Sequence, residues 1–243
     1  MPTIKLDNVT KWYHGASPRR GGTGQREIAV RDVDLTIQQG EFVFVVGSNG
    51  AGKSTLLKLI TSAEKPNHGK VFWDSRELSH VTHKSKSRAR LLFGYVPQET
   101  SLLRKLTVQD NLRIVARVGL RCLETENQLQ ARLSKVLGLV GVPGSELLYP
   151  AELTRGECRR VELARAMINS PPVLVLDELT ANLDDGSSWD MLHLLQEINN
   201  KGTTVIMATN SGEYVNIMRK RVVTMTNGHI LGDVQKGKYG DVI

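Results

Sequence analysis

The spacing of apolar residues changes along the chain, and each spacing predicts a different kind of element. Alternating or short apolar runs bounded by turn residues predict strands. These runs cover residues 3–9, 28–37, 69–74, 91–96, 221–226 and 229–234. Asn227-Gly228 between the last two predicts a hairpin. Two continuous apolar runs, residues 171–178 and 203–209, are typical of strands buried on both faces of a parallel sheet.

Between residues 107 and 142 the apolar residues recur at steps of three and four, which predicts helices with one buried face. The apolar positions are Leu112, Val115, Ala116, Leu120, Leu129, Leu133, Val136, Leu137 and Leu139. Pro143-Gly144 ends this region, and further helices are expected over about 157–169 and 186–199. The pattern therefore predicts an α/β fold interrupted by a helical insert.

Composition is consistent with one large globular domain. The chain has 243 residues, 40% hydrophobic and 23% charged. No stretch approaches the ~20 apolar residues that span a bilayer, and the N-terminus lacks the apolar segment of a signal peptide, so a cytoplasmic protein is expected. Its two cysteines, Cys122 and Cys158, show no metal-ligand spacing and are too few for a disulfide framework.

The net charge of +7 permits contact with an anionic membrane surface or with nucleic acid. The basic residues gather in three clusters: Arg19, Arg20 and Arg26; Lys84, Lys86, Arg88 and Arg90; and Arg219, Lys220 and Arg221. Ordinary solvated loops and helix ends are the more common explanation of such clusters. Charge alone therefore leaves the partner open.

A glycine-rich loop between a strand-like run and a helix-like run carries the strongest chemical signal. It reads Gly47, Ser48, Asn49, Gly50, Ala51, Gly52, Lys53, Ser54 and Thr55. Glycines let backbone N–H groups surround a phosphate, and the helix N-terminus adds partial positive charge. Lys53 would reach the β- and γ-phosphates, and the Ser54 hydroxyl would bind Mg²⁺. An ordinary glycine turn is the alternative, and the flanking strand and helix argue against it.

Two adjacent carboxylates, Asp177 and Glu178, close the buried-type run at 171–178. In a phosphate-loop protein the first holds Mg²⁺ through water, and a carboxylate beside it can polarise a water for attack on the γ-phosphate. Acids often flank strands, so the pair gains its meaning from the glycine loop upstream.

The order of several weaker features resembles the ATP-binding-cassette (ABC) family over nearly the whole chain. These features are Tyr13, the glycine loop, Gln98, Leu153-Thr154-Arg155-Gly156-Glu157, Asp177-Glu178 and Asp184. The resemblance implies that Tyr13 stacks on adenine and that Gln98 links the γ-phosphate to a membrane partner. It also implies that Thr154, Arg155, Gly156 and Glu157 complete the site of an opposite subunit, with Asp184 communicating across the dimer.

The same resemblance implies a phosphate-loop core with N-terminal antiparallel strands and a small helical subdomain. The core would be residues 1–97 and 170–243, and the subdomain residues 98–169, within one domain of 1–243. ATP and Mg²⁺ would be bound, the metal by Ser54, Gln98 and Asp177. Catalysis would use Lys53, Gln98, Glu178 and Asn210.

Within the family, the segments 40–44, 52–60, 205–209 and the tail are similar to ATPases that act in bacterial cell division. This similarity implies an integral membrane partner, a head-to-tail dimer and a peripheral place at the cytoplasmic face of the plasma membrane. Nucleic acid is not expected, because the segment between Gln98 and Leu153 is too short for the long coiled coil of a DNA-repair ATPase and has no cysteine pair.

Three positions depart from the family pattern. Arg155 stands where a signature glycine is usual, Asn210 where histidine is usual, and Leu179 where proline is usual. Losing one preorganised donor to a transition-state oxygen typically costs ~10²–10³ in rate. An ATP-binding scaffold with little hydrolysis therefore stays open. The ATPase of a lipoprotein or small-molecule exporter, which shares the fold and the short length, stays open as well.

Overall fold

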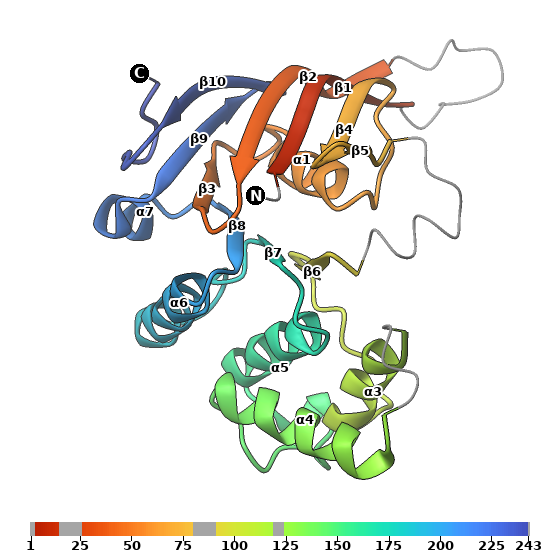
Figure 1. The fold of residues 1–243 in the computed structure, drawn as a ribbon. Helices are drawn as coiled ribbons and strands as arrows, with labels where there is room; N and C mark the ends of the chain where they lie inside the picture. Colours follow the sequence, from red (N-terminus) through yellow and green to blue (C-terminus); the bar gives the residue numbers. More distant parts are fainter. Residues whose placement is uncertain (1–2, 15–25, 80–90, 119–123, 243) are drawn as a thin grey trace, which may run out of the picture. The chain divides into compact units, whose positions relative to one another are not determined.

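The computed structural model describes residues 3–14, 26–79, 91–118 and 124–242. The chain forms two compact units, one comprising residues 1–90 and 206–243 and the other residues 91–205. Figure 1 shows the elements of each unit in chain order. Leu120, Cys122, the basic cluster at 84–90, and Arg19 and Arg20 lie outside the described residues.

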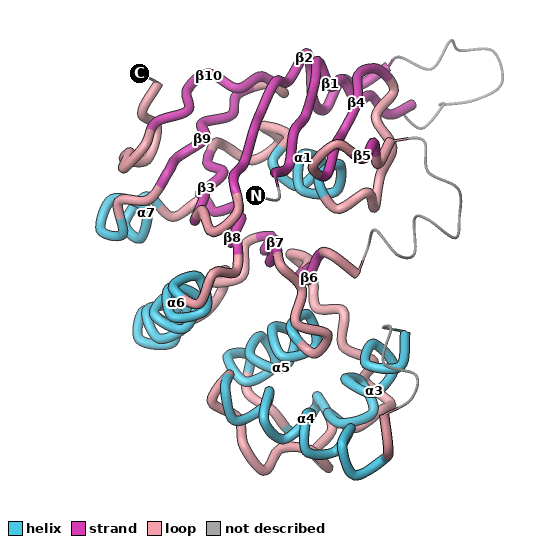
Figure 2. The backbone as a smooth tube through the Cα atoms, viewed as in Figure 1, coloured by secondary structure: helices cyan, strands magenta, loops and turns pink. Residues whose placement is uncertain are grey.

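An antiparallel sheet begins the first unit (Figures 1 and 2). Its strands are β1 (Thr3–His14), β2 (Arg26–Gln38), β4 (His68–Trp73) and β5 (Arg76–Glu77), in the order β2-β1-β4-β5. Ile4 pairs with Ile37 and Leu6 with Leu35, and all four are buried. The alternation in the sequence therefore places one face of each strand in the core.

The remainder of the first unit surrounds the glycine loop. Its elements are β3 (Phe42–Val46), α1 (Lys53–Ile60), the end of β8 (Thr204–Thr209), α7 (Gly212–Met218), β9 (Arg221–Thr226) and β10 (His229–Val234). Strand β3 runs parallel to β9 and is buried throughout. Strands β9 and β10 form the predicted hairpin, with Asn227 at φ 48° and Gly228 at φ 82° in its turn.

The second unit pairs two parallel strands and adds helices. Strands β6 (Phe93–Val96) and β7 (Val173–Asp177) run side by side. The helices are α3 (Val108–Val118), α4 (Glu126–Leu139), η1 (Pro150–Glu152), α5 (Arg155–Met167) and α6 (Asp185–Asn200). A Cβ on Gly94 of β6 would lie 2.5 Å from the Ala166 carbonyl oxygen, so glycine lets α5 pack directly on this strand.

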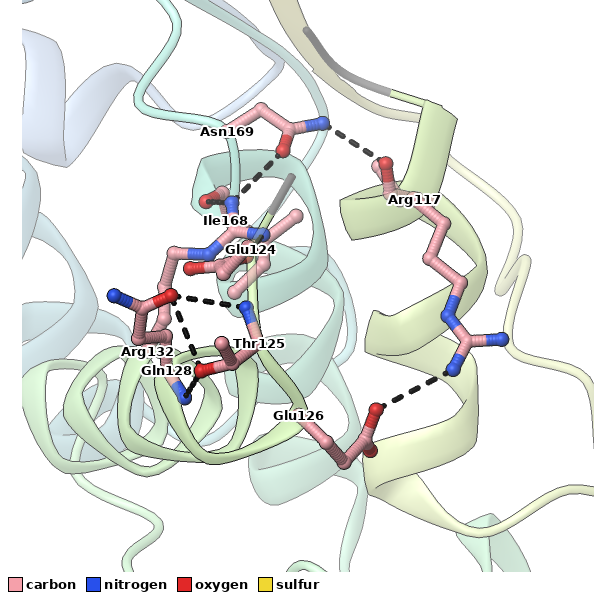
Figure 3. Close-up of polar contacts among 9 residues, drawn as sticks. Arg117, Glu124, Thr125, Glu126, Gln128, Arg132, Ile168 and Asn169 are labelled. Carbon is pink, nitrogen blue, oxygen red and sulfur yellow. Dashed lines mark hydrogen bonds and ion pairs between the residues drawn. The ribbon is translucent and has the colours of Figure 1, made fainter. Parts of the chain in front are cut away.

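Charged and amide side chains join α3, α4 and the end of α5 (Figure 3). Arg132 pairs with Glu124 at 2.6 Å and donates to the Ile168 carbonyl and the Asn169 side chain. Asn169 in turn donates to the Val115 carbonyl of α3. Arg132 and Glu124 expose only 11% and 16% of their side chains, so the network is largely buried. Apolar burial of Leu112, Leu129, Leu133 and Leu137 supplies the rest of this packing.

Helix α5 begins earlier than the apolar spacing predicts, at Arg155 rather than near Glu157. Thr154 is its N-cap, with its hydroxyl accepting from the Glu157 N–H and Glu157 accepting from Thr154. This capping box fixes the start of the helix.

No helix in the described part of the chain is long and apolar enough to cross a bilayer.

Candidate functional site

The residues singled out from the sequence fall into two groups, one in each unit. Tyr13, the glycine loop and Asn210 belong to the first unit, and Gln98, residues 154–157, Asp177, Glu178 and Asp184 belong to the second. Each group has its own geometry.

The glycine loop follows β3 and is shaped by close backbone contacts. Gly47 has φ 148°, and a Cβ there would lie 2.2 Å from the Met225 carbonyl oxygen. Gly52 has φ 102°, and a Cβ there would lie 2.2 Å from the Ala29 carbonyl oxygen. Both positions therefore require glycine for space as well as for backbone conformation. Gly50, at φ 79°, has open space around its Cβ position.

Lys53 opens α1 directly after this loop and is almost fully buried. Its ammonium group donates to the Gly47 carbonyl at 2.8 Å and to the Ser48 carbonyl at 3.1 Å. Ser54 and Thr55 follow in the first turn and are half-buried. That turn contains no acidic residue, so no carboxylate within it offsets the partial positive charge of the helix N-terminus. Backbone donors, an ammonium group and a hydroxyl converge here, and this set fits a phosphate with its Mg²⁺.

Asn210 lies beside the glycine loop, at the end of β8. Its amide Nδ2 donates to Asn49 Oδ1 at 2.8 Å. The residue is exposed, so the amide is accessible to a ligand at the loop. The structure thus brings the predicted Asn210 and Asn49 together.

Tyr13 lies near the end of β1 and is 36% exposed. The ammonium group of Lys11 is 5.1 Å from the centroid of its ring. Lys11 is itself anchored by Glu64 at 3.0 Å and by the Lys65 carbonyl at 2.9 Å. The tyrosine ring is therefore partly exposed and has a fixed cation beside it.

In the second unit, Asp177 ends β7 and is 2% exposed. Tyr95 on the neighbouring strand β6 hydrogen-bonds to it, in a position the sequence did not single out. Burial, together with the charge and hydrogen bond of Asp177, raises the pKa of Tyr95 to about 12. The phenol therefore remains protonated beside the carboxylate at neutral pH.

Glu178 follows in the left-handed backbone region, at φ 50°. Such a conformation is uncommon for a residue with a side chain and is often kept at functional sites. Gln98 donates from Nε2 to Glu178 Oε2 at 3.0 Å. The structure therefore joins two of the predicted catalytic residues, which lie 80 positions apart in sequence.

Residues 154–157 form the first turn of α5 and its cap. Hydrogen bonds from the Thr154 backbone and hydroxyl lower the pKa of Glu157. Arg155 is exposed, and a Cβ on Gly156 would lie 3.7 Å from Ser187 Oγ, an ordinary contact. Asp184 caps α6 by accepting from the Ser187 N–H at 2.8 Å, and hydrogen bonds from Ser187 lower the pKa of its carboxyl group. Asp184 thus has a structural function irrespective of any other role.

A pocket of about 700 Å³ lies within the second unit. Its lining includes Gln98, Leu102, Arg104, Arg155, Cys158 and Asn182. Desolvation is the main cause that raises the pKa of the Cys158 thiol, so this cysteine is mostly protonated and weakly nucleophilic at neutral pH. The pocket therefore places the Gln98 loop and the start of α5 around one cavity.

Sequence reasoning also missed Arg159 and Glu162 of α5, which bind the loop that carries Gln98. Arg159 donates to the carbonyls of Pro97 and Gln98. Charged residues at a three-residue spacing on a helix were the available signal, but such spacing also occurs on solvated helices.

Comparisons with known proteins identify the family of the chain. The ABC transporter family matches residues 30–181. The cell division ATP-binding protein FtsE of Bacillus subtilis is 41% identical over 213 residues, covering 87% of this chain and 92% of that protein. FtsE of Mycobacterium tuberculosis is 38% identical, covering 98% of both. A dimeric structure of the ATP-binding cassette MJ0796, in a post-hydrolysis state with ADP and Pi, is 27% identical with a TM-score of 0.87, covering 97% of this chain and 100% of that one.

Proposed function

Because the chain belongs to the ABC transporter family of ATPases, we propose that it is the ATP-hydrolysing subunit of a membrane complex acting in bacterial cell division. The observation that carries the catalytic part is the hydrogen bond from Gln98 to Glu178, directly after Asp177. The cell-division part is supported by the FtsE relatives, which align over nearly the full chain.

Binding of ATP uses the first unit. The loop from Gly47 to Gly52 surrounds the phosphates with backbone N–H groups, and Lys53 exchanges its loop carbonyls for phosphate oxygens. Asn210 donates its amide to the γ-phosphate in place of the usual histidine. Tyr13 offers its exposed ring to the adenine.

By resemblance to the family, Mg²⁺ would be held by the Ser54 hydroxyl, the Asp177 carboxylate acting through water, and the Gln98 side-chain oxygen. Mg²⁺, when bound, neutralises charge on the β- and γ-phosphates. Tyr95 restrains the Asp177 carboxylate through its hydrogen bond. Gln98 already donates from its nitrogen to Glu178, which leaves the oxygen of the same amide for this purpose.

Glu178 acts on the attacking water. Its carboxylate accepts the water's hydrogen bond and polarises it for in-line attack on the γ-phosphate. Gln98 holds this carboxylate in place, because the hydrogen bond at 3.0 Å fixes the side-chain direction. Exchange of Glu178 for glutamine removes the base and leaves the ATP-binding loop unchanged.

Two copies assemble head to tail, so that the first turn of α5 in one copy faces the ATP of the other. MJ0796, which shares the fold, is dimeric in two solved structures. Thr154, Gly156 and Glu157 supply the hydroxyl, the close backbone and the cap, and Asp184 lies at the start of α6. Arg155 is exposed in this turn and adds a guanidinium side chain where glycine is usual.

The membrane partner is an integral subunit of the FtsX type, and the chain is peripheral to it at the cytoplasmic face of the plasma membrane. An apolar surface on the second unit suits such a partner. Leu103 is 49% exposed and Leu147 is 71% exposed, next to the exposed Leu148 and Tyr149. The backbone of this segment is fixed to α3, since Val108 N–H donates to the Leu148 carbonyl at 2.8 Å.

A matched pair of variants tests this surface. Leu147→Asp should prevent co-purification with the membrane subunit, whereas Ile217→Asp, at a 59% exposed apolar position on the first unit, should not. Leu102, beside Leu103 in the sequence, is buried, so a substitution there would disturb packing and could not test this surface. Normal co-purification of Leu147→Asp would exclude this surface.

An ATP-binding scaffold is the second candidate function. The bond from Asn210 to Asn49 occupies one amide donor that would otherwise face the γ-phosphate, and Arg155 replaces a glycine. Both features favour slow turnover and leave the ATP-binding loop intact.

Steady-state phosphate release by the chain with its membrane subunit distinguishes the two functions, with Glu178→Gln as the blank. Turnover clearly above the blank supports the ATPase. Turnover equal to the blank, with ATP still bound, supports the scaffold.

A further inference from the structure

The loop that carries Gln98 lies outside any helix or strand. Residues 97–103 follow β6 and precede the turn that leads to α3. A loop without ladder hydrogen bonds needs other partners for its polar backbone groups. In this chain, α5 supplies them.

Three charged residues of α5 face the loop at three-residue spacing, which places them on one side of the helix. Arg159 donates to the Pro97 carbonyl at 3.0 Å and to the Gln98 carbonyl. Glu162 accepts from the Thr100 hydroxyl at 2.8 Å and from the Ser101 N–H at 2.6 Å.

Arg165 extends the same row and binds the Ser101 carbonyl at 2.7 Å and its hydroxyl. Arg159 and Glu162 are also paired with each other, at 2.8 Å. Their side chains are 11% and 1% exposed, so water cannot readily replace either partner. Four of the five residues from 97 to 101 are therefore bound by side chains of the helix that begins at Arg155.

From these contacts we propose that Arg159 and Glu162 are positioning residues for hydrolysis, which set Gln98 and through it the carboxylate of Glu178. The chain of contacts is continuous: Arg159 to the Gln98 carbonyl, then Gln98 Nε2 to Glu178 Oε2 at 3.0 Å. Because α5 starts at residues 154–157, movement of that helix moves Gln98 directly. The inference rests on the proposed ATPase function.

Arg160 offers a matched control on the same helix. It donates to the Val140 carbonyl at 2.9 Å and approaches Asp190 at 3.6 Å, and neither contact involves residues 97–101. The test variant is Arg159→Gln, which shortens the side chain and removes the charge of the guanidinium. The control variant is Arg160→Gln. Arg159→Lys keeps the charge and can reach fewer acceptors at once.

Two measurements on the full-length protein with its membrane subunit test the proposal. For Arg159→Gln we expect kcat to fall about tenfold or more, the loss typical of a hydrogen bond to a charged group, while the KM for ATP stays near wild type. Arg159→Lys should recover part of kcat, and Arg160→Gln should retain all of it. Amide exchange at Ser101 should accelerate in Glu162→Gln without nucleotide present.

The outcomes distinguish failure of the positioning role from failure of the proposed ATPase function. Equal kcat in Arg159→Gln and Arg160→Gln, or a loss confined to KM, would overturn the positioning role. If the wild type binds ATP without hydrolysing it, the proposed function fails, and unchanged exchange at Ser101 in Glu162→Gln would then remove the loop restraint as well.

Discussion

The glycine loop at residues 47–52 and the Gln98 loop at residues 97–101 both present polar groups to a ligand, but they are held in shape by different means. The first is defined by backbone packing, since Gly47 and Gly52 have no room for a Cβ. The second is held by side chains, mainly Arg159 and Glu162 of α5. A backbone-defined loop tolerates almost no substitution at its tight points, whereas a side-chain-held loop can be loosened one contact at a time.

The largest effect is expected from Gly47→Ala. The new Cβ would lie 2.2 Å from the Met225 carbonyl oxygen, and backbone atoms cannot yield as a flexible side chain can. We expect ATP binding, measured by calorimetry, to weaken by about 100-fold or more, given the steric clash and the strained φ of 148°. Gly50→Ala is the control, because its Cβ meets nothing within 4 Å.

Gly50→Ala should weaken binding much less, by the ~1–2 kcal/mol of a left-handed residue with a side chain. If both variants bound ATP equally, backbone space would not be what defines this loop, and the comparison with the Gln98 loop would lose its basis.

The next effect concerns the buried polar network of Figure 3, which is also held by side chains. Arg132→Met leaves Glu124 without its partner at 2.6 Å and leaves the Ile168 carbonyl without a donor. We expect the free energy of unfolding to fall by about 3 kcal/mol, as for other buried pairs broken on one side. Urea unfolding followed by circular dichroism measures this loss.

Lys135→Met on the same helix is exposed and should change stability by less than ~0.5 kcal/mol. A loss for Arg132→Met no larger than this would mean that apolar packing alone stabilises the helical part of the second unit.

The glycine loop, the Gln98 loop and the regular elements around them also differ in how well the sequence predicts them. The regular elements form where local sequence patterns predict them. The Asn227-Gly228 hairpin forms over the predicted residues, and apolar runs coincide with β3, β7 and β8. The start of α5 differs from the one that apolar spacing predicts, because the capping box of Thr154 and Glu157 determines where the helix begins.

The glycine loop could be proposed from the sequence because its chemistry is contained in consecutive residues. The restraint on Gln98 could not be proposed in this way, because Arg159 lies 61 positions away from it in the sequence. The same holds for the contact between Tyr95 and Asp177, which lie on two different strands. Contacts between residues far apart in sequence follow from tertiary packing, and a single sequence carries no spacing rule for them.

A smaller effect is expected at Asn210, where a side chain assists the backbone-defined loop. If its amide donates to the γ-phosphate, Asn210→Ala should lower kcat about tenfold, as for loss of one hydrogen bond to a charged group. ATP affinity should change little, because Lys53 and the loop backbone remain. Phosphate release under saturating ATP gives kcat.

Asn49→Ala separates the two roles of this amide, since it removes the Asn49 acceptor of Asn210 at 2.8 Å and keeps Asn210 itself. It should maintain or raise kcat. A fall in kcat equal to that of Asn210→Ala would show that the Asn49–Asn210 bond itself, rather than donation to phosphate, is what turnover requires.

The smallest effect is a pH dependence at Tyr95, which restrains Asp177 by a side-chain contact. The pKa of this phenol is raised from 10.0 to about 12, mainly by burial. The folded state therefore keeps a proton that the unfolded chain loses, so the stabilisation is complete below pH 10 and is lost as the pH rises through 12. The unfolding midpoint in urea should consequently decline between about pH 10 and pH 11, and this decline should be smaller in Tyr95→Phe. Tyr149→Phe, at a 46% exposed position, is the control and should follow the wild type. Identical declines in all three proteins would mean that Tyr95 does not hold its proton beside Asp177.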